Sequence, residues 1–212
     1  PVEWVTPAQI KARFPLFRVD QIVGGTFCSL DGTMDSNAVL MAYKNKAVEL
    51  GVEYIVEEVI EILKADGRVS GVRLASGDEL SAKFVVNSAG AWAQKVARTV
   101  GVELPVDPVK RQVFVLETNV ETGEAIYPLT VFPSGLYLIQ EHAKVFMASK
   151  SHPEDPVGFE FDWNRQVFID RIWPELVEYI PAFDQLKIVR GWAGLYAVNP
   201  FDGNAILGEW RR

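Results

Sequence analysis

The chain of 212 residues has few of the residues that build disulfides and metal centres: one cysteine, Cys28, and two histidines, His142 and His152. A single cysteine excludes an internal disulfide and is typical of proteins that work in a reducing compartment. These three residues do not stand at metal-ligand spacing. We therefore expect no metal site and a cytoplasmic location.

A dominant basic face is also missing, and so is any long apolar run. The chain carries 21 Lys and Arg against 28 Asp and Glu, a formal net charge of -7. An acidic balance of this kind excludes nucleic acid as the expected partner. No apolar run reaches the roughly 20 residues of a membrane-spanning helix, and the first residues lack the apolar core of a signal peptide. No transmembrane segment is expected.

The motifs of hydrolases and of common nucleotide-binding folds are absent as well. There is no GxSxG, no Walker A loop and no GxGxxG, because Gly24-Gly25 has neither a third glycine nor a helix after it. His142 is predicted in a turn and His152 in a polar loop, which leaves a catalytic triad without a suitable base. A hydrolytic function is therefore not expected.

The stretch FVVNSAGAW, residues 84–92, is the feature around which the first half of the chain is organised. Residues 84–86 predict a buried strand, and small residues then lead into a helix that ends near Gly101. Such a turn brings backbone N–H groups to a helix N-terminus, which suits a phosphate or another anionic ligand. The alternative is an ordinary β-α turn whose small residues only allow close packing.

The first half of the chain predicts an α/β unit interrupted by a β-meander. We expect a helix that begins at Asp35 or Ser36 and ends at Gly51, followed by strands at 52–56, 60–63, 69–74 and 80–86. The Asp66-Gly67 pair between two of these strands is typical of a hairpin turn.

Beyond Pro105 and Pro108 the pattern becomes β-rich. Strands are predicted at 113–116, 125–132, 136–139, 145–148, 186–196 and 205–207, with a helix over 163–173 and a second short helix bounded by Pro174 and Pro181. Alternation along 186–196 puts Arg190 and Trp192 on one face. This pair could hold a carboxylate or a planar ring, or it could belong to an edge strand whose arginine extends to water.

Four stretches of the chain together resemble the FAD-dependent oxidoreductases of the D-amino acid oxidase superfamily, which includes glycine oxidase, sarcosine oxidase and dimethylglycine dehydrogenase. They are GGTFCSLDGTMDSNAVLMAYKNKAVELGVEYIVEEVIEI, GRVSGVRLASGDELSAKFVVNSAGAW, LPVDPVKRQVFVL and VRGWAGLYAVNPFDGNAILG. The order of these segments is more specific than any one of them.

The resemblance implies an α/β (α+β) fold in two parts. Residues 30–105 would be a partial FAD-binding α/β domain with a β-meander. Residues 106–212 would be a β-rich substrate-binding domain with an antiparallel sheet and flanking helices, and residues 1–29 its lead-in. The family's GxGxxG segment and its final flavin segment have no counterpart here, so the chain is expected to be a central piece that binds FAD weakly or not at all by itself and is inactive alone.

The resemblance also implies a reaction: hydride transfer from a C–N bond of an amino acid or a secondary or tertiary amine to FAD, with oxygen or a protein as the electron acceptor. By position, the expected cofactor-binding residues are Val59, Ala89, Gly90, Trp92 and Gln112. The expected substrate-binding residues are Tyr196, Arg190 and Tyr137. No residue is predicted as a catalytic acid or base.

One departure from the family affects the substrate. Glycine oxidase-like members carry an arginine directly after Trp-Ala-Gly-Leu, and this chain has Tyr196 there. A phenol can hydrogen-bond a carboxylate but cannot supply the charged, two-pronged contact of a guanidinium. The amino-acid sequence of residues 192–202 most resembles the branch of the family that holds dimethylglycine dehydrogenase-like proteins and an assembly factor of respiratory complex I. An assembly or interaction factor with the same fold is therefore the alternative function.

Overall fold

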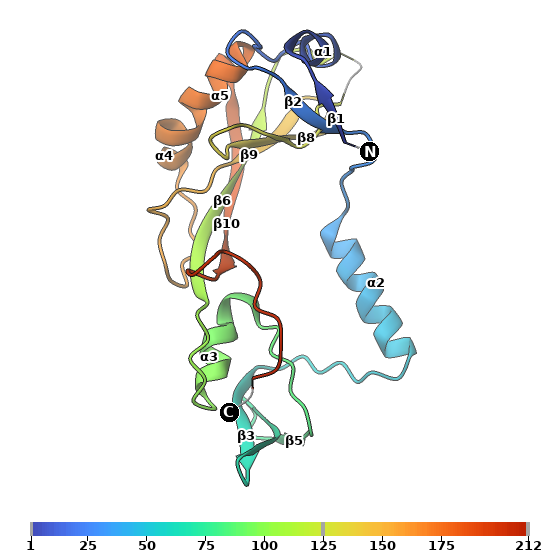
Figure 1. The fold of residues 1–212 in the computed structure, drawn as a ribbon, viewed down its shortest axis with the longest axis vertical. Helices are drawn as coiled ribbons and strands as arrows, with labels where there is room; N and C mark the ends of the chain where they lie inside the picture. The colour runs from blue at the N-terminus through green and yellow to red at the C-terminus, as the bar shows by residue number, and fades with distance from the viewer. Residues whose placement is uncertain (1, 124–125, 211–212) are drawn as a thin grey trace. The chain divides into compact units, whose positions relative to one another are not determined.

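The computed structural model describes residues 2–123 and 126–210, and Figure 1 shows its elements in chain order. The chain divides into two compact units. Unit 1 comprises the described residues of Pro1–Gly32 and Lys110–Leu195, and unit 2 those of Thr33–Val109 and Tyr196–Arg212. The predicted mixed α/β class with antiparallel sheets is confirmed. The domain limits expected from the sequence stay a prediction, and residues 196–210 group with unit 2.

Unit 1 is built on a five-stranded sheet in the order β10-β6-β9-β8-β7. Its strands are β6 (Asp107–Glu117), β7 (Thr130–Val131), β8 (Tyr137–His142), β9 (Val145–Ser149) and β10 (Lys187–Val198). Phe114 of β6 pairs with Ala148 of β9, which pairs with Leu138 of β8. These three side chains are at most 1% exposed, so one face of the sheet is the core face.

A run of short helices covers that core face. They are α4 (Arg165–Val167), the π-helical turn η2 (Phe168–Ile172), α5 (Trp173–Tyr179) and the 3₁₀ turn η3 (Pro181–Gln185). Phe168, Ile172 and Leu176 are buried against the sheet, and Phe146 meets Phe183 edge to face at 5.0 Å. The expected helix over 163–173 therefore exists, but Asn164 caps it and it begins at Arg165.

The lead-in to unit 1 is a two-stranded antiparallel ribbon, β1 (Val2–Val5) with β2 (Gly25–Cys28), around the helix α1 (Pro7–Arg13). Thr6 begins α1 with a reciprocal capping box to Gln9. The phenol of Tyr127 accepts a hydrogen bond from the backbone N–H of Leu16 at 2.9 Å, which fastens this lead-in to the sheet core.

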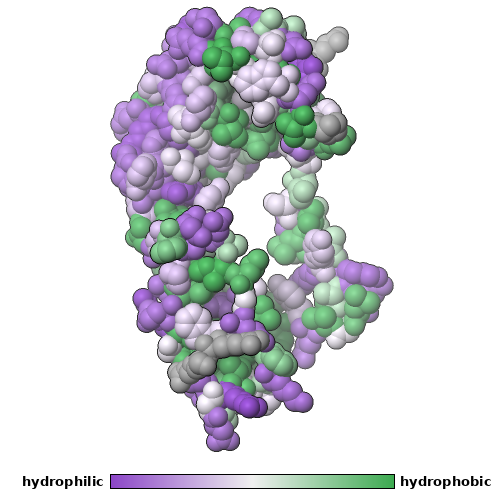
Figure 2. All heavy atoms as spheres, viewed as in Figure 1, coloured by the Kyte–Doolittle hydropathy of each residue, from purple (hydrophilic) through white to green (hydrophobic). Residues whose placement is uncertain are grey.

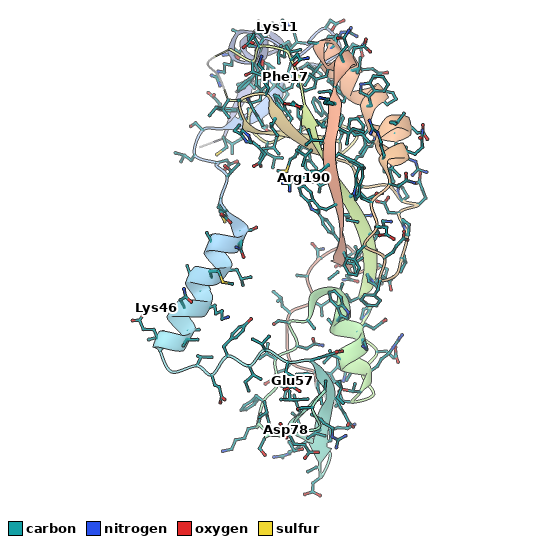
Figure 3. The ribbon with its side chains drawn as sticks, turned by 180° about the vertical axis from the view of Figure 1, so that it is seen from behind. Lys11, Phe17, Lys46, Glu57, Asp78 and Arg190 are labelled. Atoms are coloured by element: carbon teal, nitrogen blue, oxygen red, sulfur yellow. The ribbon has the colours of Figure 1, made fainter. Side chains whose placement is uncertain are left out.

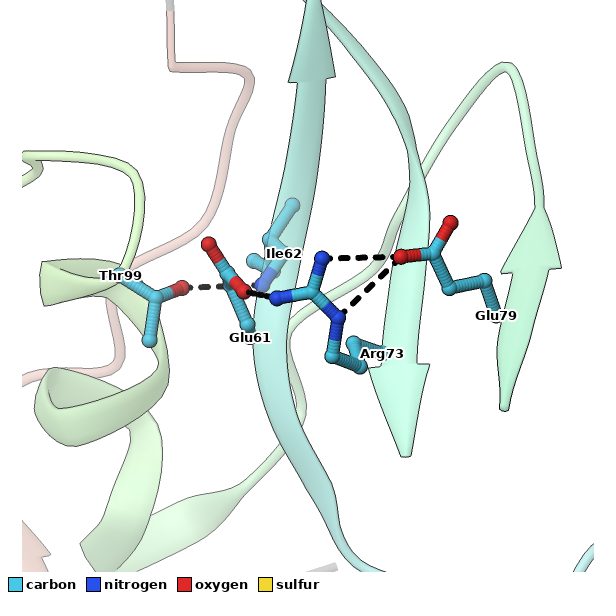
Figure 4. Close-up of polar contacts among 5 residues, drawn as sticks. All are labelled: Glu61, Ile62, Arg73, Glu79 and Thr99. Carbon is cyan, nitrogen blue, oxygen red and sulfur yellow. Dashed lines mark hydrogen bonds and ion pairs between the residues drawn. The ribbon is translucent and has the colours of Figure 1, made fainter. Parts of the chain in front are cut away.

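Unit 2 contains the helix α2 (Ser36–Glu49) and a three-stranded antiparallel meander, followed by the helical turn η1 (Gly90–Trp92) and the helix α3 (Ala93–Arg98). The strands of the meander are β3 (Val59–Ala65), β4 (Arg68–Leu74) and β5 (Glu79–Ser81). Asp66 and Gly67 both have positive φ, 50° and 76°, as a two-residue type I′ hairpin requires. Arg73 of β4 bridges Glu61 of β3 and Glu79 of β5 (Figure 4).

Two strands predicted from the sequence, 52–56 and 205–207, are absent from the described residues. The predicted strand 80–86 is reduced to β5, so its last part, 84–86, forms no ladder. Phe84 and Val86 are 81% and 86% exposed, so the prediction of a buried strand there is wrong for this chain. The expected strand 125–132 is reduced to β7, and its first residue lies outside the described part. Apolar composition alone cannot supply the ladder partner that a strand needs.

The helix α2 begins and ends where the sequence predicts. The Asp35 carboxylate accepts the N–H of Ala38 at 2.9 Å, and Gly51 follows the last turn with φ 91°. Its apolar side chains are exposed on several sides, including Leu40 (60%) and Tyr43 (75%), and hydrophobic residues are visible at the molecular surface in Figure 2. Among the helices of the described residues, none combines the length and apolarity needed to cross a membrane.

Candidate functional site

The turn between residues 87 and 92 is held by one side chain. The Asn87 side chain accepts the backbone N–H of Ala89 at 3.2 Å and donates to the carbonyl of Ala93 at 2.8 Å. Gly90 has φ 54°, a left-handed conformation that glycine adopts without strain. The chain can therefore turn sharply into η1 and α3 and present Trp92 at the start of the helix.

This turn does not offer the bare N–H groups that the sequence suggests for an anion. The N–H of Ala89 is bonded to Asn87, and the N–H of Trp92 donates to the carbonyl of Ala89 at 3.0 Å. The α3 helix is also only 6 residues long. Two N–H groups of the turn are therefore already bonded, and anion binding at this turn stays a prediction.

Helix α3 is fastened to strand β3 through Thr99. The Thr99 hydroxyl accepts the N–H of Ile62 at 3.0 Å (Figure 4). It also donates to the carbonyl of Val96 at 2.7 Å. Lys64 adds a contact to the carbonyl of Val100 at 3.0 Å. Since Ile62 is only 7% exposed, the bond to the Thr99 hydroxyl satisfies an edge-strand donor that water reaches poorly.

A cavity of about 480 Å³ lies between the start of β3 and the first turns of η1 and α3. Its walls are Glu58, Val59, Ile60, Ala89, Trp92, Lys95 and Val96. Three residues expected at the cofactor, namely Val59, Ala89 and Trp92, therefore line one cavity. Gly90 stands between two of them in the chain without lining it.

The walls of the cavity are mainly apolar, with one ion pair. The Lys95 ammonium lies 3.5 Å from the Glu58 carboxylate, and both side chains are mostly exposed. The neighbouring Glu57 carboxyl accepts hydrogen bonds from Ser76, which lower its pKa. An apolar cavity with few polar groups suits a planar heteroaromatic ring.

The second group of expected site residues lies on the sheet of unit 1. Arg190 and Trp192 are both on β10, and the Arg190 guanidinium stands 5.7 Å from the centre of the Trp192 ring. Figure 3 labels Arg190 on this strand. Gly191 between them faces Trp163, and Trp163 contacts Phe114 of the core face. Arg190 and Trp192 therefore project from the opposite face of the sheet, which we name the open face because both of these side chains are exposed on it.

Tyr137 shares that open face with Arg190, because its ladder partner Ser149 and the core residue Ala148 alternate along β9. β8 and β10 are separated by β9 and β6, so three strand spacings of about 4.8 Å place the two backbones roughly 14 Å apart. Both side chains would have to reach inward to touch one small molecule.

The remaining expected site residues, Gln112 and Tyr196, lie on β6 and β10. The Gln112 side-chain oxygen accepts the N–H of Asn164 at 2.6 Å, on the core side of β6. Tyr196 is 56% exposed and belongs to unit 2. The roles expected for Gln112 and Tyr196 stay predictions.

Two residues that line the cavity, Lys95 and Val96, are not among the cofactor-binding residues expected from the sequence, although their spacing from Trp92 indicates them. They follow Trp92 at the i+3 and i+4 positions, which share one face of a helix. Glu58 and Ile60 flank Val59 and were equally readable as its neighbours. Among the described residues, no group of three or more His, Cys, Asp or Glu side chains could hold a metal ion.

Comparison with known proteins gives the same assignment along the whole chain. The family model described as FAD dependent oxidoreductase matches residues 1–212. The chain is 29% identical over 240 residues to FAD-dependent oxidoreductase domain-containing protein 1 of Xenopus laevis, covering 98% of this chain and 48% of that protein. It is 30% identical over 143 residues to glycine oxidase of Pseudomonas putida, covering 68% of this chain and 37% of that protein.

Solved structures share the fold. L-proline dehydrogenase from P. horikoshii superposes with a TM-score of 0.88 at 24% identity, over 100% of this chain and 56% of that one. Glycine oxidase from Geobacillus kaustophilus superposes with a TM-score of 0.77 at 23% identity, over 99% of this chain and 54% of that one. The chain thus spans about half the length of the curated relatives it matches. With the family model covering every residue, this chain belongs to the FAD-dependent oxidoreductase (DAO) family.

Proposed function

We propose that the protein to which this chain belongs oxidises a C–N bond of an amino acid or of a secondary or tertiary amine, with FAD as the hydride acceptor. The observation that carries this proposal is that Val59, Ala89 and Trp92 line the same cavity. The names of the relatives point the same way, since they include a glycine oxidase and a sarcosine dehydrogenase.

The residues of the cavity fit part of such a cofactor. Val59, Ala89 and Val96 provide an apolar lining for a flat ring, and the Trp92 indole supplies an aromatic wall. When bound, FAD supplies the two-electron acceptor that no side chain of this chain can replace. The work left to the protein is to bind, to orient the amine and to keep water away.

On the substrate side, Arg190 is the group best suited to a carboxylate. Its contact among the described residues is the ring of Trp192, and no carboxylate of the described chain pairs with it. An arginine held on an aromatic ring keeps its N–H donors available for a two-pronged contact with a carboxylate. Tyr137 on the same face and Tyr196 further along β10 are proposed as additional substrate contacts.

The experiment is anaerobic mixing of the full-length parent protein with glycine, N-methylglycine, N,N-dimethylglycine and proline, followed by absorbance. We expect a flavin band that one of these compounds bleaches. The Arg190→Lys variant should raise KM for that compound about tenfold or more, because the paired charged hydrogen bond is lost. A bound flavin that none of the four compounds reduces would contradict amine oxidation.

The alternative is an assembly or interaction factor that keeps the fold, with FAD structural or absent. It is motivated by Tyr196, which stands where glycine oxidase-like members have an arginine. The same mixing experiment separates the two, because an interaction factor gives no amine-dependent bleaching.

A further inference from the structure

The strand that carries Arg190 and Trp192 is held in the sheet from one side only. β10 is the edge strand of the five-stranded sheet and pairs with β6 alone among the described strands. An edge strand has one hydrogen-bonded neighbour, so its position depends more on side-chain packing than that of an inner strand does. What packs behind β10 therefore matters for the two side chains in front.

Gly191, between Arg190 and Trp192, lies directly beneath the indole of Trp163. A Cβ atom at Gly191 would stand 2.7 Å from Trp163 Cε3 and 2.8 Å from Cδ2, closer than real Cβ contacts. Both atoms belong to a rigid ring, which cannot give way as a flexible chain end could. The indole also meets the ring of Phe114 edge to face at 6.1 Å, so it spans β6 and β10.

The segment that carries Trp163 is itself fixed to β6 by neighbouring residues. The Asn164 N–H donates to Gln112 at 2.6 Å, and the Lys110 ammonium, with a side chain only 6% exposed, contacts Glu160 at 2.6 Å. Lys110, Gln112 and Phe114 alternate along β6 and therefore share its core face. The segment that carries the indole is thus bonded to β6 on either side of Trp163.

We propose that Trp163 and Gly191 are positioning residues of the substrate site. The indole packs against the β10 backbone at Gly191 on the core face of the sheet and thereby fixes the position of Arg190 and Trp192 on the opposite face. This inference rests on the proposed function for its consequence in catalysis. The packing claim itself needs no substrate. Neither residue touches the open face, so both act through β10.

The test uses the full-length parent protein and the variants Gly191→Ala, Trp163→Ala and their combination. Gly194→Ala is the matched control, because Gly194 lies on the same strand and a Cβ atom at this position would have nothing within 4 Å. In Gly191→Ala we expect amide exchange of residues 188–193 to quicken about tenfold, because forcing extra volume into a packed contact shifts an opening equilibrium by that order. The control should exchange like the unaltered protein.

The combined variant makes the mechanism specific. Removing the indole leaves room for the new methyl group, so Trp163→Ala with Gly191→Ala should exchange no faster than Trp163→Ala alone. Additive effects, or a Gly191→Ala variant that matches the Gly194→Ala control, would overturn the proposal.

Kinetics then separate this inference from the proposed function. With an amine that reduces the flavin, Gly191→Ala should raise KM about tenfold while kcat changes less, as expected when a binding group is misplaced by a fraction of an ångström. Faster exchange with an unchanged KM would overturn the positioning role. If no amine reduces the flavin of the unaltered protein, the proposed function fails, and the exchange data still decide whether Trp163 holds β10.

Discussion

Replacing Thr99 by valine tests how the two walls of the cavity are held together. Valine keeps the shape of the side chain but removes the hydroxyl that accepts from Ile62 and donates to Val96 (3.0 and 2.7 Å). The Val96 carbonyl keeps a second donor, the N–H of Thr99 at 3.2 Å, so the main loss falls on the Ile62 N–H. An unsatisfied donor at a site this poorly exposed costs about 1–2 kcal/mol.

That cost is measurable as local opening between β3 and α3. It corresponds to a factor of roughly 5–30 in an opening equilibrium, so the Ile62 amide should exchange faster by that factor in the full-length protein. FAD should also bind more weakly, because β3 and α3 form the two sides of the cavity. Thr99→Ser is the matched control, since it keeps the hydroxyl. Unchanged exchange of Ile62 in Thr99→Val would refute the role given to this hydroxyl.

Three further predictions follow from single contacts. Asp35→Ala should lower the helix content measured by circular dichroism and should lower the free energy of unfolding by about 1 kcal/mol, whereas Asp35→Asn keeps the cap. Tyr127→Phe removes the acceptor of the Leu16 N–H and should lower the free energy of unfolding in denaturant by about 1 kcal/mol. Burial raises the pKa of Tyr127, so the stability that the neutral phenol contributes should be lost as the pH rises through the pKa of the folded protein. Hydrogen bonds from Ser76 lower the pKa of Glu57, so the stability that the Glu57 carboxylate contributes should be lost as the pH falls through its pKa in the folded protein. An NMR titration should show that Ser76→Ala raises the pKa of Glu57.

The sequence predicts best where a local rule decides the structure. The Asp66-Gly67 hairpin and the ends of α2 depend on residues next to one another, and both are found as expected. The segments 52–56 and 84–86 show the limit of the same reasoning. Their composition is that of buried strands, but a strand forms only against a partner, and none of the described strands pairs with them.

The candidate site was predictable in part. Resemblance along the chain directed attention to Val59, Ala89 and Trp92, which the fold brings to one cavity. Helical spacing could have added Lys95 and Val96. The packing of Trp163 on Gly191 was not readable, because no local pattern reports a contact between residues so far apart in the chain.

The central claim, that the cavity between β3 and α3 holds part of FAD, is tested most directly by the FAD dissociation constant of the full-length protein with Ala89→Leu. Ala89 lines the cavity, so a leucine there fills space that the cofactor would need. Ala65→Leu, at the exposed far end of β3, is the control. We predict that Ala89→Leu weakens FAD binding about tenfold or more, as overpacking implies, while Ala65→Leu leaves it unchanged. Equal FAD affinity in the two variants and the unaltered protein would contradict the account.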